Sequence, residues 1–257
     1  MQNLNEEVAE TVMLARPVLL IAYSELALKG KKRAYMERVL KRQVSKKLRK
    51  WDVYRKVFVD QGRIVVWGGG PTELRRMPGV HHVIRAIALE KVPPEELAGE
   101  ISKLVEVESP FAVRVRRADK RYPMNSVQLA SLIGSKIEGE VDLKRPKTEV
   151  FVEVRDLVYV YTNKDLFEGV GGLPYGIEGT VYVEGDLLEG ALLARRGARV
   201  VFSRPLEGLE KLAEALPEPL SVSKHSEGLP KSSELFKLTC VPETTLRKVR
   251  IMLGEVP

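Results

Sequence analysis

Alternating apolar and polar stretches divide the first ninety positions into short elements. The apolar run Val18–Tyr23 predicts a buried strand, and apolar residues at helical spacing from Met36 to Trp51 predict a helix. The expected elements, in chain order, are a strand at 18–23, a helix at 32–50, strands at 53–59 and 63–67 joined through Asp60-Gln61-Gly62, a short helix at 72–77 and a strand at 80–89. This β-α-β-β-α-β order predicts a ferredoxin-like fold.

The next segment has the pattern of a second α/β unit. Along Phe111–Arg117, alternation places apolar side chains on one face of a strand and Arg114 and Arg116 on the other. The expected elements are a helix from Pro94 to about Val105, a strand at 111–117, a helix at 126–137 and paired strands at 149–154 and 157–161.

Beyond a glycine-rich junction at 169–176, the pattern predicts two βα repeats that begin a parallel sheet. Their expected elements are a strand at 180–183, a helix at 186–195, a strand at 198–202 and a helix at 206–216. Residues after Pro217 show little periodicity, so we expect a core too small for an independent domain. The junction lacks a Gly-Lys-Ser/Thr sequence, which favours a flexible hinge over a nucleotide-binding loop.

These patterns together predict an α+β protein of several small domains. The expected boundaries are a flexible extension at 1–16, a ferredoxin-like domain at 17–90, a second α/β domain at 91–167, a linker at 168–179 and a small C-terminal α/β domain at 180–257. The acidic, polar start is unlike a signal peptide, and no apolar run reaches the roughly 18–20 residues of a membrane span. We therefore expect a cytoplasmic protein with no membrane partner.

Positive charge is concentrated near the start of the chain. Residues 1–90 hold 18 Lys and Arg against 9 Asp and Glu, and eleven of these cations lie between Lys29 and Lys50 with one acid, Glu37. A local basic field of this kind favours polyanion binding. The cations at the strand–loop–helix junction are candidate phosphate contacts: Lys29, Lys31, Lys32 and Arg33. The alternative is a solvated loop in which Lys29 or Arg33 pairs with Glu25 or Glu37.

A second cluster begins within the expected strand at 111–117 and continues beyond it. Five cations occur within eight residues, beside one acid, Asp119. These candidate RNA contacts are Arg114, Arg116, Arg117, Lys120 and Arg121. Arginine suits both phosphate forks and stacking on unpaired bases. The alternative is a polar face on which Asp119 neutralises a neighbour.

Few residues suit metal or thiol chemistry. The three histidines are His81, His82 and His225, and adjacent strand residues point to opposite faces, so no multi-histidine metal site is expected. Cys240 is the single cysteine, which excludes an intramolecular disulfide and favours a small buried side chain over a nucleophile.

Three motifs together resemble the tRNA 4-thiouridine synthetase (ThiI) family. They are Tyr-Ser-Glu-Leu-Ala-Leu-Lys-Gly-Lys-Lys-Arg at 23–33, Arg-Val-Arg-Arg-Ala-Asp-Lys-Arg-Tyr-Pro at 114–123 with Ser126 and Gly134, and Gly-Gly-Leu-Pro-Tyr-Gly at 171–176 with Gly179. The resemblance spans residues 18–180. It implies that the second α/β domain is a THUMP domain, which in this family recognises the acceptor end of tRNA.

The chain departs from the family after the third motif. The family continues with a strand and a Ser-Gly-Gly-x-Asp-Ser PP-loop that holds the phosphates of ATP, whereas this chain has Glu184, Gly185 and Asp186 there. Two carboxylates oppose phosphate by like-charge repulsion. We therefore expect the C-terminal domain to be a shortened, degenerate PP-loop (Rossmann-like) remnant, with no cofactor.

The leading hypothesis is a tRNA-binding protein of the ThiI type that recognises the acceptor stem and 3′ end in 4-thiouridine formation, without ATP-dependent catalysis of its own. Its partners would be tRNA and a separate catalytic PP-loop or other modification subunit, and the family resemblance leaves a homodimer open. Two alternatives stay open: a tRNA sulfurtransferase with an atypical nucleotide site, and a tRNA adaptor for another modification enzyme such as an acetyltransferase.

Overall fold

The computed structural model describes residues 15–23, 30–226, 228–235 and 241–256. The candidate contact Lys29 and the single cysteine, Cys240, therefore lie outside the described residues. The described residues divide into two compact units: 17–86 with 161–256, here called the junction unit, and 87–160, here called the arginine unit.

The first part of the junction unit has the predicted ferredoxin-like order. Its elements are β1 (Arg16–Ala22), α1 (Arg33–Lys50), β2 (Val57–Asp60), β3 (Arg63–Trp67), the 3-10 helix η3 (Thr72–Arg76) and β4 (His82–Leu89). The strands lie in the order β2-β3-β1-β4, and β3 is antiparallel to both β1 and β2. The second predicted helix is only a 3-10 helix, because Gly68-Gly69-Gly70-Pro71 and Pro78 bracket it closely. The apolar stripe of α1 packs on the sheet through Met36, Leu40, Val44 and Leu48.

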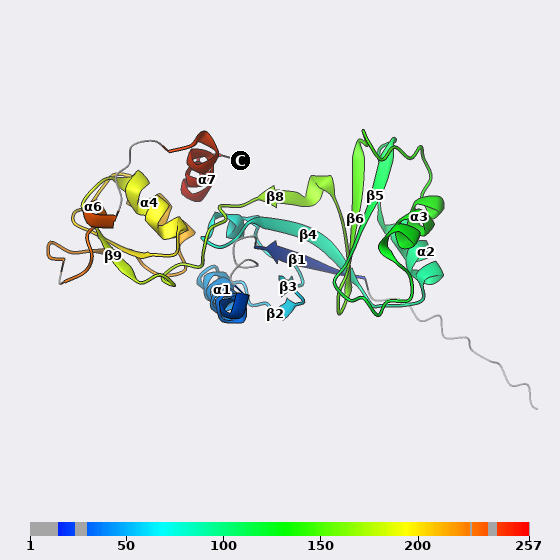
Figure 1. The fold of residues 1–257 in the computed structure, drawn as a ribbon, viewed down its shortest axis with the longest axis horizontal. Coiled ribbons are helices and arrows are strands. Elements are labelled where there is room, and N and C mark those ends of the chain that lie inside the picture. Colours follow the sequence, from blue (N-terminus) through cyan, green and yellow to red (C-terminus); the bar gives the residue numbers. More distant parts are fainter. Residues whose placement is uncertain (1–14, 24–29, 227, 236–240, 257) are drawn as a thin grey trace, which may run out of the picture. The chain divides into compact units, whose positions relative to one another are not determined.

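The arginine unit confirms the predicted α/β pattern. It contains α2 (Pro94–Leu104), β5 (Phe111–Arg117), α3 (Ser126–Lys136), β6 (Thr148–Val154) and most of β7 (Val158–Thr162). Strands β5 and β6 are parallel, and the last residues of β4 pair with β7. Both helices lie on the same side of β5 and β6 (Figure 1), where Leu97, Ile101, Leu129 and Ile133 complete the core. An Asn125–Gln128 capping box starts α3.

The C-terminal part of the junction unit contains the two predicted βα repeats. Its elements are β9 (Thr180–Val183), α4 (Leu187–Arg195), β10 (Arg199–Phe202), α5 (Leu209–Ala215), β11 (Ser221–Val222), α6 (Ser232–Leu235) and α7 (Glu243–Leu253). Strand β10 lies between β9 and β11 and is parallel to both. The predicted α+β fold class, with three α/β parts, is confirmed.

The segment after Pro217 is more ordered than its weak periodicity indicates. Helix α7 places Val249, Ile251, Met252 and Leu253 in the same core as β9, β10 and α4. One of its main-chain oxygens also accepts a hydrogen bond from η3: Arg76 Nε donates to Met252 O at 3.1 Å. The small C-terminal core is therefore supplemented by contacts with the ferredoxin-like part, which periodicity within the tail could not indicate.

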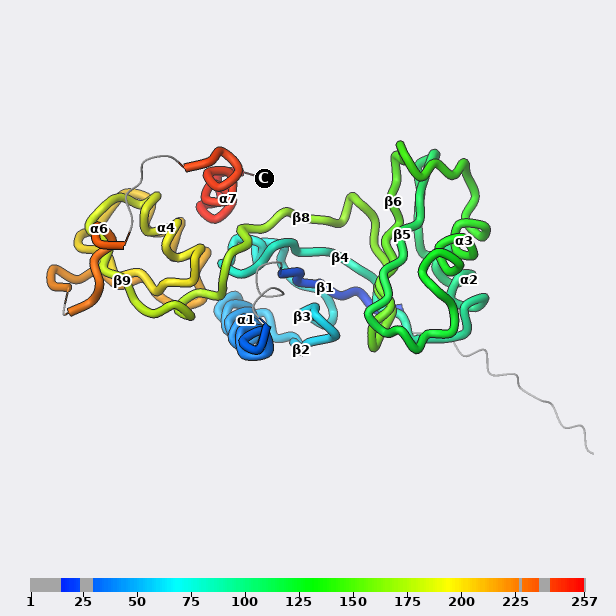
Figure 2. Tube along the Cα trace, in the orientation of Figure 1, coloured from blue at the N-terminus to red at the C-terminus, as the bar shows by residue number. Residues whose placement is uncertain are grey.

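The junction at 169–176, which the sequence predicts to be flexible, is hydrogen-bonded to its neighbours. After β8 (Leu166–Glu168), which pairs with β4, the chain runs to β9 (Figure 2) and is bonded along the way to the residues before β4 and to α4. Gly171 N donates to Val80 O at 2.6 Å, and Leu173 N donates to Arg195 O at 3.0 Å. Val170, Leu173 and Tyr175 are buried. Glycine here permits close main-chain approach rather than motion.

Within the described ranges, no helix is both long and apolar enough to cross a membrane. The domain boundaries given in the sequence analysis stay predictions.

Candidate nucleic-acid interface

The cations at the start of α1 fall into two groups. Lys31 and Lys32 are exposed on the 3-10 helix Gly30–Lys32 that leads into α1. Arg33 is instead paired with Glu37, with Nε and Oε1 2.8 Å apart, as the alternative interpretation of this segment anticipated. The Tyr23 hydroxyl also donates to Glu37. Burial, together with this hydrogen bond, raises the pKa of Tyr23 above its ordinary value. Arg33 is thus only partly available to a phosphate.

One lysine of α1 is buried and is not part of the basic surface. Lys47 is 1% exposed, and its Nζ donates to the main-chain oxygens of Glu214 and Leu216 at the end of α5. Helix C-termini favour positive charge, and the Trp51 ring lies 5.2 Å from the ammonium. Burial, reinforced by Lys50 and Arg76, lowers the pKa of Lys47 to about 8. In the sequence, Lys47 is one of the eleven cations at 29–50 that favour polyanion binding. Its contacts show instead that it has a structural role.

The arginines of β5 lie on both faces of the strand. Arg114 forms an ion pair with Glu149, with Nε and Oε1 3.0 Å apart, and also donates to Leu143 O at 2.8 Å. Arg116 is exposed and forms no ion pair with any of the described residues. Arg117 lies on the opposite face, toward α3, and donates to Tyr122 O and Ser126 Oγ at 3.1 and 3.4 Å. Within the described chain, the guanidinium group of Arg116 therefore forms no ion pair, while those of Arg114 and Arg117 are held by hydrogen bonds.

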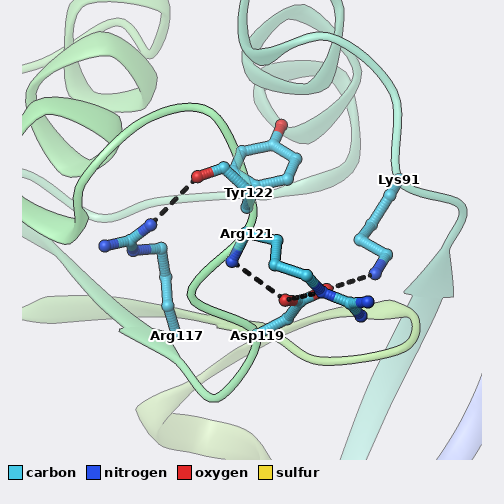
Figure 3. A network of polar contacts seen from close by, with 5 residues as sticks. All are labelled: Lys91, Arg117, Asp119, Arg121 and Tyr122. Atoms are coloured by element: carbon cyan, nitrogen blue, oxygen red, sulfur yellow. Dashed lines mark hydrogen bonds and ion pairs between the residues drawn. The ribbon is translucent and has the colours of Figure 1, made fainter.

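The loop after β5 is organised by a buried carboxylate (Figure 3). Asp119 is 6% exposed and accepts from Lys91 Nζ at 2.8 Å and from Arg121 Nε at 3.0 Å. The hydrogen bonds from Arg121 and Lys91 hold the pKa of Asp119 well below its ordinary value. Arg121 is still 83% exposed in its side chain, and Lys120 beside it is exposed. Asp119 thus neutralises neighbours, as the alternative interpretation allowed, while it also fixes the loop that carries them.

An apolar groove lies beside these cations, between β5 and α3. Its volume is about 550 Å³, and its lining includes small residues at helical spacing on α3, among them Ala130 and Gly134. Its rim is apolar and exposed: Val127 is 79%, Val141 52% and Leu143 61% exposed. Arg114 lines the same groove. In the sequence, only the spacing of small residues along α3 hints at this groove, which the sequence patterns did not predict.

The edge of the C-terminal sheet where the family would hold ATP does not fit phosphate. Asp186 caps α4 by accepting from Glu189 N at 2.9 Å, so the helix N-terminus already has its anion. The Glu189 carboxylate lies so close to Gly185 that a β-carbon there would overlap it. Glu184 is held by Ser233 at 2.9 Å and Lys231 at 3.1 Å, and these contacts lower its pKa. The described residues at this edge therefore oppose a triphosphate.

No three His, Cys, Asp or Glu side chains in the described ranges gather closely enough to hold a metal ion. His81 and His82 contact each other edge to face, with ring centroids 4.3 Å apart. Burial, more than the neighbouring charges, lowers the pKa of His82 to about 4.

Comparison with known proteins identifies two domains. The family model of the ThiI ferredoxin-like domain matches residues 18–83, and that of the THUMP domain matches residues 95–163. A probable tRNA sulfurtransferase of Clostridium perfringens (strain ATCC 13124) is 32% identical over 200 residues, which cover 70% of this chain and 51% of the relative. Another, of Natranaerobius thermophilus, is 32% identical over 212 residues, which cover 71% of this chain and 50% of the relative. The chain thus spans about half the length of the curated relatives it matches.

Two solved structures are similar over most of the chain. The crystal structure of PH1313 from Pyrococcus horikoshii has a TM-score of 0.72 at 25% identity, covering 93% of this chain and 99% of that one. A 4-thiouridine synthetase in complex with RNA and ATP has a TM-score of 0.58 at 25% identity, covering 77% of this chain and 56% of that one. The resemblance drawn from the three motifs is confirmed.

Proposed function

We propose that this chain, which contains a ThiI ferredoxin-like domain and a THUMP domain, binds tRNA in the course of tRNA modification. The proposed ligand is the acceptor stem with its single-stranded 3′ end, and the proposed modification is 4-thiouridine formation. RNA in the complex with the structural neighbour supports a nucleic-acid ligand for this architecture.

The observation that carries the proposal is the groove between β5 and α3 in the arginine unit. Unpaired bases bind to apolar or aromatic surfaces, while their phosphates bind to cations beside them. The exposed rim of Val127, Val141 and Leu143 offers the first kind of surface. Arg114 and Arg117 offer the second, because both are held in place by neighbours. A single-stranded end matches this combination better than a duplex does.

We further propose that the C-terminal part of the junction unit takes no ATP-dependent step itself. Asp186, Glu184 and Glu189 occupy the edge at which the family binds the nucleotide. A separate PP-loop subunit would then supply the adenylation and sulfur transfer. Formation of 4-thiouridine by the purified chain with ATP and a sulfur donor would contradict this part of the proposal alone.

Removal of the 3′ single-stranded end of tRNA is expected to weaken binding, and so is Val127→Asp, each by at least about tenfold. The introduced carboxylate would lie in the groove, where it repels phosphate and makes the apolar rim polar. Val222→Asp is the matched control, because Val222 is also exposed, in β11. Fluorescence anisotropy with intact and trimmed tRNA measures both effects. Equal binding of the two tRNAs, or equal affinities of the two variants, would remove the groove as the 3′-end site.

Arg116→Ala is expected to weaken tRNA binding and to reduce the salt slope by about one. The reason is that an exposed guanidinium, free of ion pairs within the described chain, releases one counterion when it contacts a phosphate. Lys32→Ala tests the start of α1 in the same way. Binding isotherms over a series of salt concentrations give the slopes. Slopes that match the unsubstituted chain in both variants would place the RNA on another face.

A further inference from the structure

A second hollow lies within the junction unit. Its volume is about 350 Å³, within the usual range of small-molecule sites of roughly 300–1,000 Å³. One wall is a face of α1, and the opposite wall is the bonded junction around Tyr175 with the start of β10. The residues that carry the argument are Tyr35, Arg42, Gln43, Lys46, Arg199 and Glu218.

Helical spacing explains the first wall. Tyr35, Arg42 and Lys46 are separated by seven and four residues, so their side chains share one side of α1. Gln43 joins this wall to the other, because its Nε2 donates to Tyr175 O at 2.7 Å. The Tyr175 hydroxyl in turn accepts from Val200 N at 3.1 Å. One hydrogen bond therefore joins the two walls, a second fixes the Tyr175 ring on its own wall, and the hollow is preformed.

The hollow has a surplus of positive charge. Arg199 donates to Glu218 Oε2 from Nε at 3.2 Å and from Nη2 at 2.8 Å, and Lys46 Nζ lies 3.6 Å from the other oxygen. Arg42 is exposed and forms no ion pair with any residue of the described ranges. Three cations and one carboxylate thus line the hollow. An anion with more than one charge could bind these cations more strongly than Glu218 does.

Two further features are polar and aromatic. The Gln43 Oε1 atom is buried and, in the described structure, accepts no hydrogen bond, although buried acceptors are normally satisfied. The side of α1 that carries Arg42 also presents the ring of Tyr35, which is 51% exposed. A ligand that complements this wall would have an N–H donor, a flat ring and a phosphate. A nucleotide has all three.

The location separates this hollow from the edge where the family binds ATP. Arg199 begins β10 and pairs in register with Thr180, which begins β9. The hollow is therefore at the amino ends of these parallel strands. The position of the PP-loop, at Glu184–Asp186, follows the carboxyl end of β9.

We propose that this hollow is a nucleoside phosphate site, for a free nucleotide or for one nucleotide of an RNA strand. The phosphate binds Arg42, Lys46 and Arg199 and displaces the Glu218 carboxylate, which occupies these cations in the absence of the ligand. The base stacks on Tyr35. Where the ligand is a nucleotide of RNA, the site extends the proposed RNA-binding function and rests on it; where it is a free nucleotide, the site is independent of that function.

The test is calorimetric titration of the full chain with three probes at low salt: AMP, inorganic phosphate and a short single-stranded RNA. Arg42→Gln and Tyr35→Ala are expected to weaken AMP binding by about tenfold each. Glu218→Gln is expected to strengthen it several-fold, because it removes a like charge from the phosphate position. Arg38→Gln, an exposed cation on the same helix that does not line the hollow, is the matched control and is expected to leave AMP binding unchanged.

The pattern across the variants decides between outcomes. AMP binding with this pattern supports a free-nucleotide site, and the same pattern with RNA alone assigns the site to a nucleotide within RNA. The proposal would be overturned if inorganic phosphate bound as tightly as AMP. It would also be overturned if Arg42→Gln, Glu218→Gln and Arg38→Gln all had the same affinities for AMP and RNA. Val127→Asp separates the two sites, because it is expected to weaken tRNA binding while AMP binding stays the same.

Discussion

Gly172→Ala is expected to destabilise the chain by about 3 kcal/mol or more, because the added methyl group meets two obstacles at once. Gly172 has a φ of +80°, which L-residues with a side chain rarely adopt. A β-carbon there would also overlap the main-chain oxygen of Arg195, which is the acceptor for Leu173 N. The nearest obstacles are main-chain atoms of Arg195, which cannot move aside as the end of a flexible side chain could.

Gly179→Ala is the matched control for this experiment. Its φ of +93° imposes the same kind of backbone strain, but a β-carbon would meet no atom within 4 Å. We expect a loss of about 1–2 kcal/mol in the free energy of unfolding from strain alone. Urea unfolding followed by tryptophan fluorescence compares the two variants. If Gly172→Ala unfolds no more readily than Gly179→Ala, the junction is a loose hinge after all.

The second large effect concerns the pH dependence of stability at Lys47. Its pKa is about 8 in the folded chain, against the ordinary lysine value of 10.5 that applies when the chain is unfolded. Between these values the unfolded chain binds more protons, so the free energy of unfolding rises with pH through this window. The full difference corresponds to on the order of 3 kcal/mol. Lys47→Met is expected to lack this rise, although it also leaves the main-chain oxygens of Glu214 and Leu216 without their donor.

Urea unfolding at pH 7.5 and at pH 10 measures the rise. Tryptophan fluorescence suits the measurement because Trp51 lies beside the Lys47 ammonium. Lys41→Met is the control, since it removes a lysine from the same helix without touching α5, and we expect it to retain the rise. An equal rise in Lys47→Met and in the unsubstituted chain would mean that other groups cause it.

The cations near Asp119 could be predicted from the sequence, but their separate tasks could not. Strand alternation correctly placed Arg114 and Arg116 on one face of β5. Alternation could not show that Asp119 would be buried between Lys91 and Arg121, because Lys91 lies 28 positions away in sequence. The structural interpretation of this loop therefore applies to Asp119, and the functional interpretation applies to the exposed cations beside it. Which of these cations contact RNA stays a prediction.

The C-terminal part shows why local sequence patterns predicted some elements and not others. The βα repeats were found because each strand and helix carries its own apolar period. Helix α7 was missed because its apolar residues are crowded into its second half, and its partners include Arg76 of η3. A short helix stabilised by remote donors leaves little trace in its own sequence.

Sequence patterns were sufficient to establish the order of most elements, the ferredoxin-like and THUMP parts, the concentration of basic residues and the Glu-Gly-Asp sequence at 184–186. They were sufficient because these properties depend on residues that are near one another in the chain. The three-dimensional arrangement was needed to show that the glycine junction is bonded, that Lys47 is buried, and that two hollows lie beside cations. Each of these depends on contacts between segments far apart in sequence, which close packing alone brings together.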